Sequence, residues 1–492
     1  MENSVNEFKS TTLKKSVRWV IFITMWIHCV HVSQSSGILS PSGAKISEDL
    51  QMNQVEYGCI SPVYSIGRWV GAVLFSFVFN SINRKYIMVF AGVTHGLINM
   101  FYMFTSNGYV ILALRGFAGI GHIWPPIYTG LWIGQLSIQK YAKFWKNCSS
   151  ICSPFGRASG FFIDLFAGAE NWRYGFFYNG VVLLTCGIIF LFIPNIYFSS
   201  KLVAVTDKDG KEEIRPSRTE VVSIFNVRNS DPHDRDVNVF ERDKSLLADP
   251  FYMILLWARC INVFLRSALQ FWLVKYIISL GYTNKPLTTF VFAYMITCNP
   301  LIGNLIGAKL SGLFGGYLKK NSLFYVLAWQ LAACLAFTPA PYFEEWWKFC
   351  IFASLYQILG MANVSPIGNI MTTSLNKEQK KRAAGVMAVF NVIIGSVPAP
   401  PIYGLILDRY GEYNKHCAMI AYKNYLWLTI PLIGIAITIR YFRFKNKGDE
   451  PLIGERKEDV VEYKEPNQEW VDDFKLKTKD GEEKGETELK EV

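Results

Sequence analysis

The sequence predicts an all-α membrane protein with twelve transmembrane helices in two parallel six-helix repeats. Three observations support this fold class. Of 492 residues, 51% are hydrophobic and only 18% are charged, below the roughly 25% typical of soluble domains. Apolar runs of the roughly 20 residues that a bilayer-spanning helix needs recur along most of the chain. One long polar segment divides these runs into two groups of six.

The apolar runs and the polar segments around them divide the chain into five regions. We expect a cytoplasmic N-terminal segment at 1–17, a six-helix bundle at 18–198, a cytoplasmic linker at 199–248, a second six-helix bundle at 249–445 and a disordered acidic cytoplasmic tail at 446–492. The spans are expected at 18–39, 55–79, 86–105, 109–136, 144–168, 174–198, 250–280, 286–314, 321–340, 346–374, 382–409 and 422–444. The tail is charged and lacks the apolar residues that folding requires.

Basic residues in the short loops indicate the orientation in the membrane. If the N-terminus is cytoplasmic, four short inner loops and their edges hold eleven Lys and Arg residues, whereas the outer loops hold six. Cytoplasmic loops carry such an excess in membrane proteins. We therefore expect both termini and the linker on the cytoplasmic side.

Sequence patterns recur in the same order in the two halves. A glycine followed six residues later by a proline occurs in the fourth span at Gly119 and in the tenth at Gly360. The pattern P-x5-G-x3-D begins at Pro154 in the fifth span and at Pro398 in the eleventh. Two halves in the same order, each with an even number of spans, are typical of parallel repeats about an axis along the membrane normal.

The fourth span is the most unusual of the twelve. Leu112–Gly134 is apolar for more than 20 residues, yet it contains Arg115, His122 and Pro125–Pro126. Arg in such a run costs about 2.5–3.5 kcal/mol on insertion scales, so it should face the bundle interior or a water-filled cavity. Arg115 and His122 are seven residues apart and share one helix face. They mark either a transport pathway or a buried polar pair that braces two helices. Adjacent prolines, here and at Pro400–Pro401, lack backbone donors and should kink or unwind their helices.

Six motifs carry a resemblance to a known family. They are GILSPSGAKISEDLQ at 37–51, NRKYIMV at 83–89, RGFAGIGH at 115–122, SPFGRASGF at 153–161, NWRYGF at 171–176 and GLILDRYG at 404–411. With these motifs, residues 18–444 resemble the major facilitator superfamily, and the first half resembles its spinster-like branch. The resemblance implies a transporter that alternates access by rocking its two halves.

The chain departs from this family in its gating loop and at two carboxylates. Asn80 stands where the family carries the Asp of a latch on the inward gate, and Arg84 and Lys85 remain of the loop's charges. The branch's first-span Asp corresponds to His31, and its fourth-span Glu corresponds to His122. The gate latch must therefore be weaker or built differently. Proton coupling as in the relatives is in doubt, although histidine titrates near neutral pH and could replace the carboxylates.

Central ionisable groups gather in the first half. The candidate residues for substrate binding or coupling are His31, Arg68, Arg115, His122, Arg157, Arg266, Trp272 and Asn363. Transporters of this architecture bind substrate near the midplane, at the interface between repeats. Because the set is cationic, it suits a phosphate, carboxylate or sulfate, and the fork of Arg matches two anion oxygens.

The expected function is secondary active transport of a small or amphipathic anion, and the branch resemblance implies a lysophospholipid or sphingoid phosphate. Two alternatives stay open. One is a transporter of a hydrophilic organic anion or sugar phosphate. The other is a non-transporting membrane sensor or scaffold that signals through the linker or the tail. No P-loop, metal-ligand cluster or nucleophile motif indicates an enzyme, a cofactor or a metal site.

The expected partners are the lipid bilayer and a small-molecule or lysolipid anion, with protons as a candidate coupling ion. No nucleic acid is expected, because the net charge of +11 follows from basic cytoplasmic loops. We expect a monomeric, multi-pass protein of the endolysosomal or plasma membrane.

Overall fold

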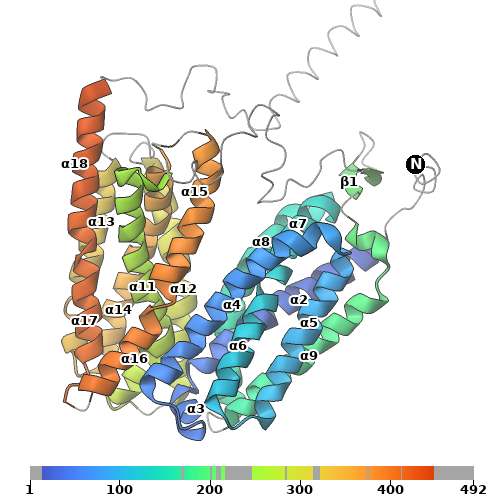
Figure 1. Cartoon of the computed structure of the whole chain (residues 1–492), viewed down its shortest axis with the longest axis horizontal. Coiled ribbons are helices and arrows are strands. Elements are labelled where there is room, and N and C mark those ends of the chain that lie inside the picture. The colour runs from blue at the N-terminus through green and yellow to red at the C-terminus, as the bar shows by residue number, and fades with distance from the viewer. Residues whose placement is uncertain are drawn as a thin grey trace, which may run out of the picture.

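The fold is two helical bundles that stand side by side (Figure 1). The computed structural model describes residues 14–167, 171–199, 202–206, 212–216, 246–282, 285–313, 322–373, 375, 377–411 and 413–447. Within these ranges, eleven helical segments are long and apolar enough to cross a membrane. The long helix α8, which is the fifth span in chain order, completes the set of twelve. It is less apolar because it contains Arg157 and several lysines near its start.

The N-terminal bundle holds the first six spans in the predicted order. They are α2 (Lys15–Leu39), α4 (Gln54–Ser81), α5 (Arg84–Phe101), α6 (Gly108–His122) with α7 (Trp124–Leu136), α8 (Gln139–Ala167) and α9 (Trp172–Phe192). The short helix α3 (Gly43–Asp49) and the 3-10 turns η1 (Tyr102–Phe104) and η3 (Asn195–Phe198) connect or follow them.

The C-terminal bundle repeats the arrangement. Its spans are α11 (Pro250–Ser279), α12 (Lys285–Leu313), α13 (Ser322–Phe337), α14 (Trp346–Met371), α15 (Lys377–Phe390) with η7 (Asn391–Ser396) and α16 (Ala399–Tyr410), and α17 (Cys417–Trp427) with α18 (Thr429–Lys447). The 3-10 turn η6 (Ala340–Tyr342) precedes α14. Two bundles of six spans confirm the predicted fold class.

Both proline pairs stand at breaks in a span, as predicted. α6 ends at His122, and α7 begins at Trp124 with prolines in its first turn. In the eleventh span, α15 passes into the π-helical segment η7, and α16 then begins with prolines in its first turn. The first turn of a helix tolerates proline because its N–H groups have no intrahelical partner. The π-helical segment itself was not predicted.

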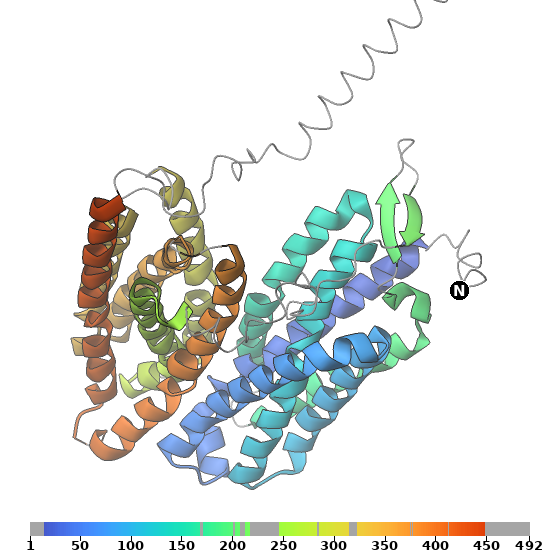
Figure 2. The ribbon, with the colours of Figure 1, turned by 45° about the horizontal axis from the view of Figure 1, so that its top comes forward.

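In the sequence between the two bundles, the chain forms a short antiparallel pair of strands, which was also not predicted. Its strands are β1 (Leu202–Thr206) and β2 (Glu212–Pro216). β1 packs against α7 and α8, at the same end of the molecule as the N-terminus and the last residues of α18 (Figure 2). Residues 200–201, 207–211 and 217–245 of the predicted linker lie outside the described residues, as do the tail after Lys447 and the first 13 residues.

The two bundles meet at the end that carries α3 and diverge toward the end that carries the N-terminus (Figure 1). Asp408 of α16 accepts hydrogen bonds from the backbone N–H groups of Gln54 and Val55, at 3.2 and 3.1 Å. Lys275 donates to the Gln54 side chain at 2.5 Å, and Ser40 donates to two carbonyls of α11. These hydrogen bonds between the bundles lie together at this closed end. With a cytoplasmic N-terminus, as the loop charges predict, the structure is inward-facing.

Contacts across the bundles complete the N-terminal cap of α4. Asn53 accepts a hydrogen bond from the Glu56 N–H at 2.8 Å, and Glu56 accepts from the Asn53 N–H at 3.0 Å. Asp408 satisfies the two N–H groups between them. The first N–H groups of a helix have no intrahelical partner, so this cap joins a carboxylate of one bundle to a helix of the other.

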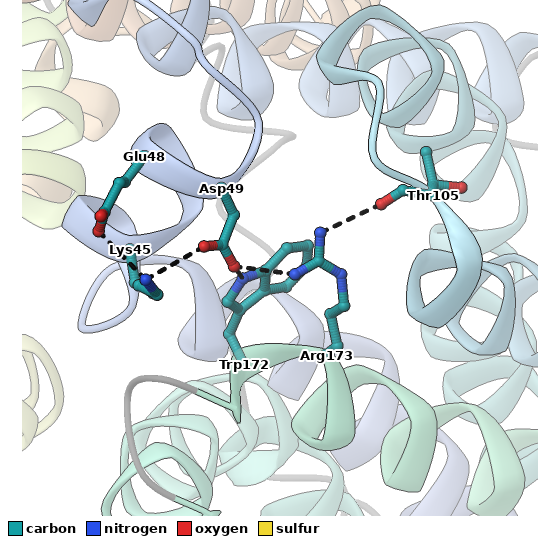
Figure 3. Close-up of polar contacts among 6 residues, drawn as sticks. All are labelled: Lys45, Glu48, Asp49, Thr105, Trp172 and Arg173. Atoms are coloured by element: carbon teal, nitrogen blue, oxygen red, sulfur yellow. Dashed lines mark hydrogen bonds and ion pairs between the residues drawn. The ribbon is translucent and has the colours of Figure 1, made fainter.

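A carboxylate on α3 braces the closed end of the N-terminal bundle (Figure 3). Asp49 accepts hydrogen bonds from the Trp172 indole at 2.9 Å and from Arg173 at 2.8 Å, and its other oxygen lies 3.3 Å from the Lys45 ammonium. Arg173 also donates to the Thr105 carbonyl at 3.3 Å. Burial acts to raise the pKa of Asp49, but these three donors outweigh it, so the pKa is lowered.

Candidate substrate site

A cavity of about 260 Å³ lies between the two bundles. Five of the predicted site residues line it: Arg68, Arg115, His122, Arg157 and Arg266. They come from α4, α6 and α8 of the first bundle and from α11 of the second. The structure thus brings together, from four helices, the charged residues that the sequence singled out.

The cavity is cationic and without a visible counter-charge. No Asp or Glu is among its described lining residues. In the described part of the chain, none of the four arginines forms an ion pair with a carboxylate. Arg115 is buried, Arg157 and Arg266 are half-buried and Arg68 is exposed. Charges that are removed from water are costly unless they are paired, so such a cluster favours an anion.

Arg115 and His122 both contact the side chain of Tyr64 on α4. The Arg115 guanidinium carbon lies 4.2 Å from the Tyr64 ring centroid, which is a cation–π contact. One guanidinium nitrogen lies 3.5 Å from the Ser35 hydroxyl. The Tyr64 hydroxyl forms a hydrogen bond with His122 Nδ1. Arg115 and His122 are only 1% and 6% exposed, so the trio forms a buried polar wall rather than a solvated surface.

Glycine allows α4 and α6 to approach closely at this wall. A Cβ atom on Gly119 would lie 2.3 Å from the Tyr64 carbonyl oxygen, well inside contact distance. A Cβ on Gly67 would lie 2.0 Å from the Gly116 oxygen. Gly119, which lies between Arg115 and His122 in the sequence, therefore accommodates a neighbouring helix rather than a ligand.

The other arginines approach the cavity from three helices. Arg157 lies on α8, and its Nε is buried with no hydrogen-bond partner among the described residues. Arg266 lies on α11, where one guanidinium nitrogen is 3.0 Å from the Met361 sulfur, a weak acceptor. Arg68 lies on α4 and also lines the cavity. The Arg157 Nε is therefore a buried donor that a ligand in the cavity could satisfy.

His31 does not line the cavity, although the sequence grouped it there. The Asn179 amide of α9 donates to the His31 carbonyl oxygen at 2.8 Å, and the same nitrogen lies 3.4 Å from His31 Nδ1. Asn179 also bonds Gln34 at 2.7 Å and accepts from Asn99 at 2.8 Å. His31 is thus part of a polar network that joins α2, α5 and α9 inside the first bundle.

Asn363 takes part in a corresponding network in the second bundle. Its amide lies 3.3 Å from the Gln330 side-chain oxygen. Gln330 in turn bonds Asn262 and Thr429, at 3.2 and 2.9 Å. Trp272 lies elsewhere, at the closed end, where its indole donates to the Pro400 carbonyl at 3.0 Å. The structure therefore places both Asn363 and Trp272 away from the cavity.

The predicted gating residues are held within the first bundle. The Arg84 guanidinium lies 4.3 Å from the Phe79 ring centroid, and the Lys85 ammonium donates to the Leu191 carbonyl at 2.8 Å. A cation at the C-terminal end of α9 is favoured by the helix dipole. Asn80 belongs to α4, and its side chain is outside the described part. In the described part of the chain, Arg84 and Lys85 thus both contact helices of the first bundle.

The sequence analysis missed a group of serines that line the cavity. They are Ser33, Ser36, Ser40, Ser61, Ser65, Ser153, Ser267 and Ser396. On α2 and α4 they are spaced three or four residues apart, which places them on one face of each helix. This spacing in an otherwise apolar span is a signal that could have identified them.

Comparisons with known proteins agree with this fold. Residues 30–400 match the Major Facilitator Superfamily. The probable sphingolipid transporter spinster homolog 1 of Arabidopsis thaliana is 22% identical over 446 residues, which cover 89% of this chain and 88% of the relative. Spinster homolog 2 of the same plant is 20% identical, covering 82% and 80%.

Solved structures show the same architecture. An inward-facing, unoccupied bacterial homolog of the human lysosomal transporter Spinster superposes with a TM-score of 0.64 at 13% identity, covering 88% of this chain and 98% of that one. The nucleoside transporter NupG superposes with a TM-score of 0.60 at 9% identity, covering 86% and 99%. The resemblance that the motifs suggested is confirmed. The chain therefore belongs to the Major Facilitator Superfamily and is a multi-pass membrane transporter related to the spinster sphingolipid transporters.

Proposed function

We propose that the chain transports an amphipathic anion by alternating access, with a phosphate-type head group bound in the central cavity. The observation that carries this proposal is the cluster of four arginines without a described carboxylate partner. Arg binds phosphate and carboxylate oxygens through paired donors, so an arriving anion would supply the counter-charge that these four arginines lack among the described residues. The relatives' name as sphingolipid transporters supports a lysophospholipid or a sphingoid phosphate.

The size and lining of the cavity favour a head group rather than an entire lipid. Its volume of about 260 Å³ is slightly below the roughly 300–1,000 Å³ of drug-sized pockets. Serine hydroxyls and cationic side chains form most of its wall, whereas the apolar members are Leu39, Phe161, Phe271 and Ile296. An acyl or sphingoid tail would have to leave the cavity between helices. The same lining also favours a second candidate, a hydrophilic organic anion or sugar phosphate.

Transport into proteoliposomes tests these alternatives. A sphingoid phosphate should enter vesicles that contain the protein faster than protein-free vesicles, whereas entry of the same base without phosphate should not depend on the protein. Competition by a sugar phosphate, with no competition by a lysophospholipid, would replace the lipid substrate by the hydrophilic one. If neither anion enters while a partner protein binds the tail, the sensor or scaffold reading would stand instead.

We propose His122 as the coupling residue. It lines the cavity beside Arg115 and hydrogen-bonds Tyr64, whereas His31 points into the α9 network. A protonated imidazole would add a donor and a positive charge toward the anion, so the proton and the substrate would bind together. Transport should be faster when the donor side is acidic, and His122→Gln should flatten this dependence while leaving exchange partly active.

His416→Gln is the matched control for this experiment. His416 lies at the closed end, beside Glu344, and does not line the cavity. Its replacement should preserve the wild-type pH profile. An unchanged profile in the His122→Gln protein would remove His122 from coupling. Lost stability with an unchanged profile would assign it the structural role of holding Tyr64.

A further inference from the structure

We propose a second oxyanion-binding site in the C-terminal bundle, near its cytoplasmic end. A pocket of about 400 Å³ opens there among α11, α12, α14 and α15. Arg259 and Lys380 supply two positive charges, and Asn304 and Asn369 supply side-chain amides. No Asp or Glu is among the described lining residues, so the pocket favours an anion as the central cavity does.

Arg259 is positioned by the backbone of α14. One terminal nitrogen of its guanidinium donates to the Val364 carbonyl oxygen at 2.6 Å. A Cβ atom on Gly368 would lie 2.8 Å from that nitrogen, so glycine leaves the space in which the guanidinium rests. The Nε of Arg259 is buried and has no hydrogen-bond partner among the described residues. The side chain is therefore fixed in position while part of its donor capacity stays unused.

The chemistry of the donors points to a phosphate-like group. A fixed guanidinium provides directed donors for two oxygens of one anion, and a lysine ammonium adds a mobile point charge. Lys380 is exposed at the pocket rim, where it can move onto a bound group. The amides of Asn304 and Asn369 can donate to the remaining oxygens. A cation would find no described carboxylate in this pocket.

The pocket is separate from the central cavity, but both lie along helix α11. The two share no lining residue, and every described residue of the pocket belongs to the C-terminal bundle. Arg259 and Arg266 are seven residues apart on α11, so they share a face and are separated by about 10 Å along the axis. A third, small cavity of about 20 Å³ lies between the two. Arg266 lines both this small cavity and the central cavity, and Val364 lines both the small cavity and the pocket.

Two sources could supply the oxyanion: a soluble phosphate-bearing solute on its way to the cytoplasm, or the head group of an acidic lipid from the cytoplasmic leaflet. Basic pockets between helices on that side of a membrane are known to hold lipid phosphates. The proposal concerns the shared phosphate chemistry. It stands whether or not the central cavity carries the substrate proposed above.

The first experiment measures binding of inorganic phosphate to the full chain in a phosphorus-free maltoside detergent, by ³¹P line broadening. Arg259→Gln and Lys380→Gln should each weaken one class of phosphate sites about tenfold, the expected loss for one charge-assisted hydrogen bond. Lys380 is exposed, so its variant should fold normally even if the Arg259 variant does not. Lys309→Gln is the matched control, since it removes an exposed charge near the same end of α12 outside the pocket.

The second experiment distinguishes the sources. The protein is reconstituted into phosphatidylcholine vesicles with a minor share of phosphatidic acid, and the phosphatidic acid retained after extraction is quantified. Enrichment on the wild type that Lys380→Gln abolishes would assign the site to a lipid head group. Phosphate binding without enrichment would assign it to a soluble anion. Wild-type behaviour of Arg259→Gln and Lys380→Gln in both experiments would overturn the proposal.

Discussion

The fifth and eleventh spans carry the same P-x5-G-x3-D pattern, but its glycine makes different contacts in the two halves. In α8 a Cβ on Gly160 would lie 2.5 Å from the Gln34 carbonyl oxygen, so this glycine packs against α2 of its own bundle. In α16 a Cβ on Gly404 would lie 2.3 Å from the Gln54 carbonyl oxygen, so this glycine packs against α4 of the opposite bundle. The glycine of the pattern thus faces its own bundle in one half and the opposite bundle in the other, although α8 also contacts α12 of the opposite bundle, where Phe161 packs against Phe292.

The π-helical segment η7 gives a physical reason for this difference. α8 is a continuous α-helix, whereas Asn391–Ser396 interrupts the eleventh span before Gly404. A π-turn accommodates an extra residue, and each residue of a helix corresponds to a rotation of about 100°. The segment beyond it therefore presents another face to its surroundings. Repeats that share a sequence pattern can acquire different roles through one local change in helix geometry.

The largest effect is expected where the halves differ most in charge, at Arg115. The repeat-equivalent position in the second half holds Tyr356. Arg115→Gln should weaken binding of a sphingoid phosphate about 10- to 100-fold, because a charge-assisted hydrogen bond contributes about 1.5–3 kcal/mol. Arg115→Lys keeps the charge but loses the fork, so it should retain measurable affinity. Tyr356→Phe should behave like wild type. The measurement is KM for uptake into proteoliposomes.

Normal uptake by both Arg115 variants, in protein that melts like the wild type, would contradict this expectation. It would mean that Arg115 only braces α6 against Tyr64 of α4. The asymmetry of charge between the halves would then be a matter of packing rather than of substrate recognition.

The paired glycines should respond differently to the same substitution. Gly160→Ala should lower the free energy of unfolding by about 1–3 kcal/mol, because α2 and α8 must separate to admit the methyl group. Gly404→Ala should instead move α16 off α4 and open the closed end, with a smaller loss of stability. Spin labels at Lys143 and Lys380, at the end opposite the closed one, would report a shorter distance by double electron–electron resonance in the Gly404 variant. Gly434→Ala is the control, since nothing lies within 4 Å of its Cβ position.

Identical distance distributions in the Gly404→Ala and Gly434→Ala proteins would contradict a gating role for the eleventh span. A strong destabilisation by Gly404→Ala without a change in distance would make its contact equivalent to that of Gly160. The proposed division of roles between the two spans would then fail.

The two internal polar networks should be of similar strength. Asn179→Ala leaves buried partners on α2 and α5 unpaired, and Gln330→Ala does the same on α11, α14 and α18. Each should lower the free energy of unfolding by about 1–3 kcal/mol, the cost of buried groups left without partners. Thermal melting of the purified proteins measures both. A shift in only one variant would show that the two bundles are held together in different ways.

The smallest expected effect lies at the closed end, at Asp49. Its pKa is lowered in the folded protein, so its contribution to stability is complete above a pH of about 4 and is lost as the pH falls through the lowered value. Asp49→Asn should cost about 0.5–1 kcal/mol at neutral pH, as for other partly exposed ion pairs. Glu344→Gln in the second half should cost less, because Glu344 is more exposed. The difference in melting between wild type and Asp49→Asn should shrink below pH 4.

Local chemistry explains which parts of the fold were predictable. Apolar runs of membrane length defined the spans, and the missing N–H of proline placed the breaks before Pro125 and Pro400. The segment η7 was not predictable, because a π-turn is selected by packing around it rather than by its own residues. The hairpin of β1 and β2 was missed because its strands are short and lie in a charged segment.

The same reasoning explains which of the predicted residues line the cavity. An arginine inside a span must avoid lipid, which predicts an interior position for Arg115 and Arg157, and both line the cavity. The cost of burial does not say which interior surface a polar group faces. His31 and Asn363 offset the cost of burial through polar contacts with Asn179 and Gln330, inside their own bundles. Trp272 likewise finds its acceptor at the closed end rather than in the cavity.

The cap of α4 by Asp408 has a consequence for how this protein can diverge. At the closed end, Asp408 recognises two backbone N–H groups, and Ser40 recognises two backbone carbonyls. A backbone partner is present whatever side chain the position carries. Natural variation at Val55 should therefore be independent of variation at Asp408. Coevolution between the two bundles should be weak at these contacts, even though they hold the bundles together.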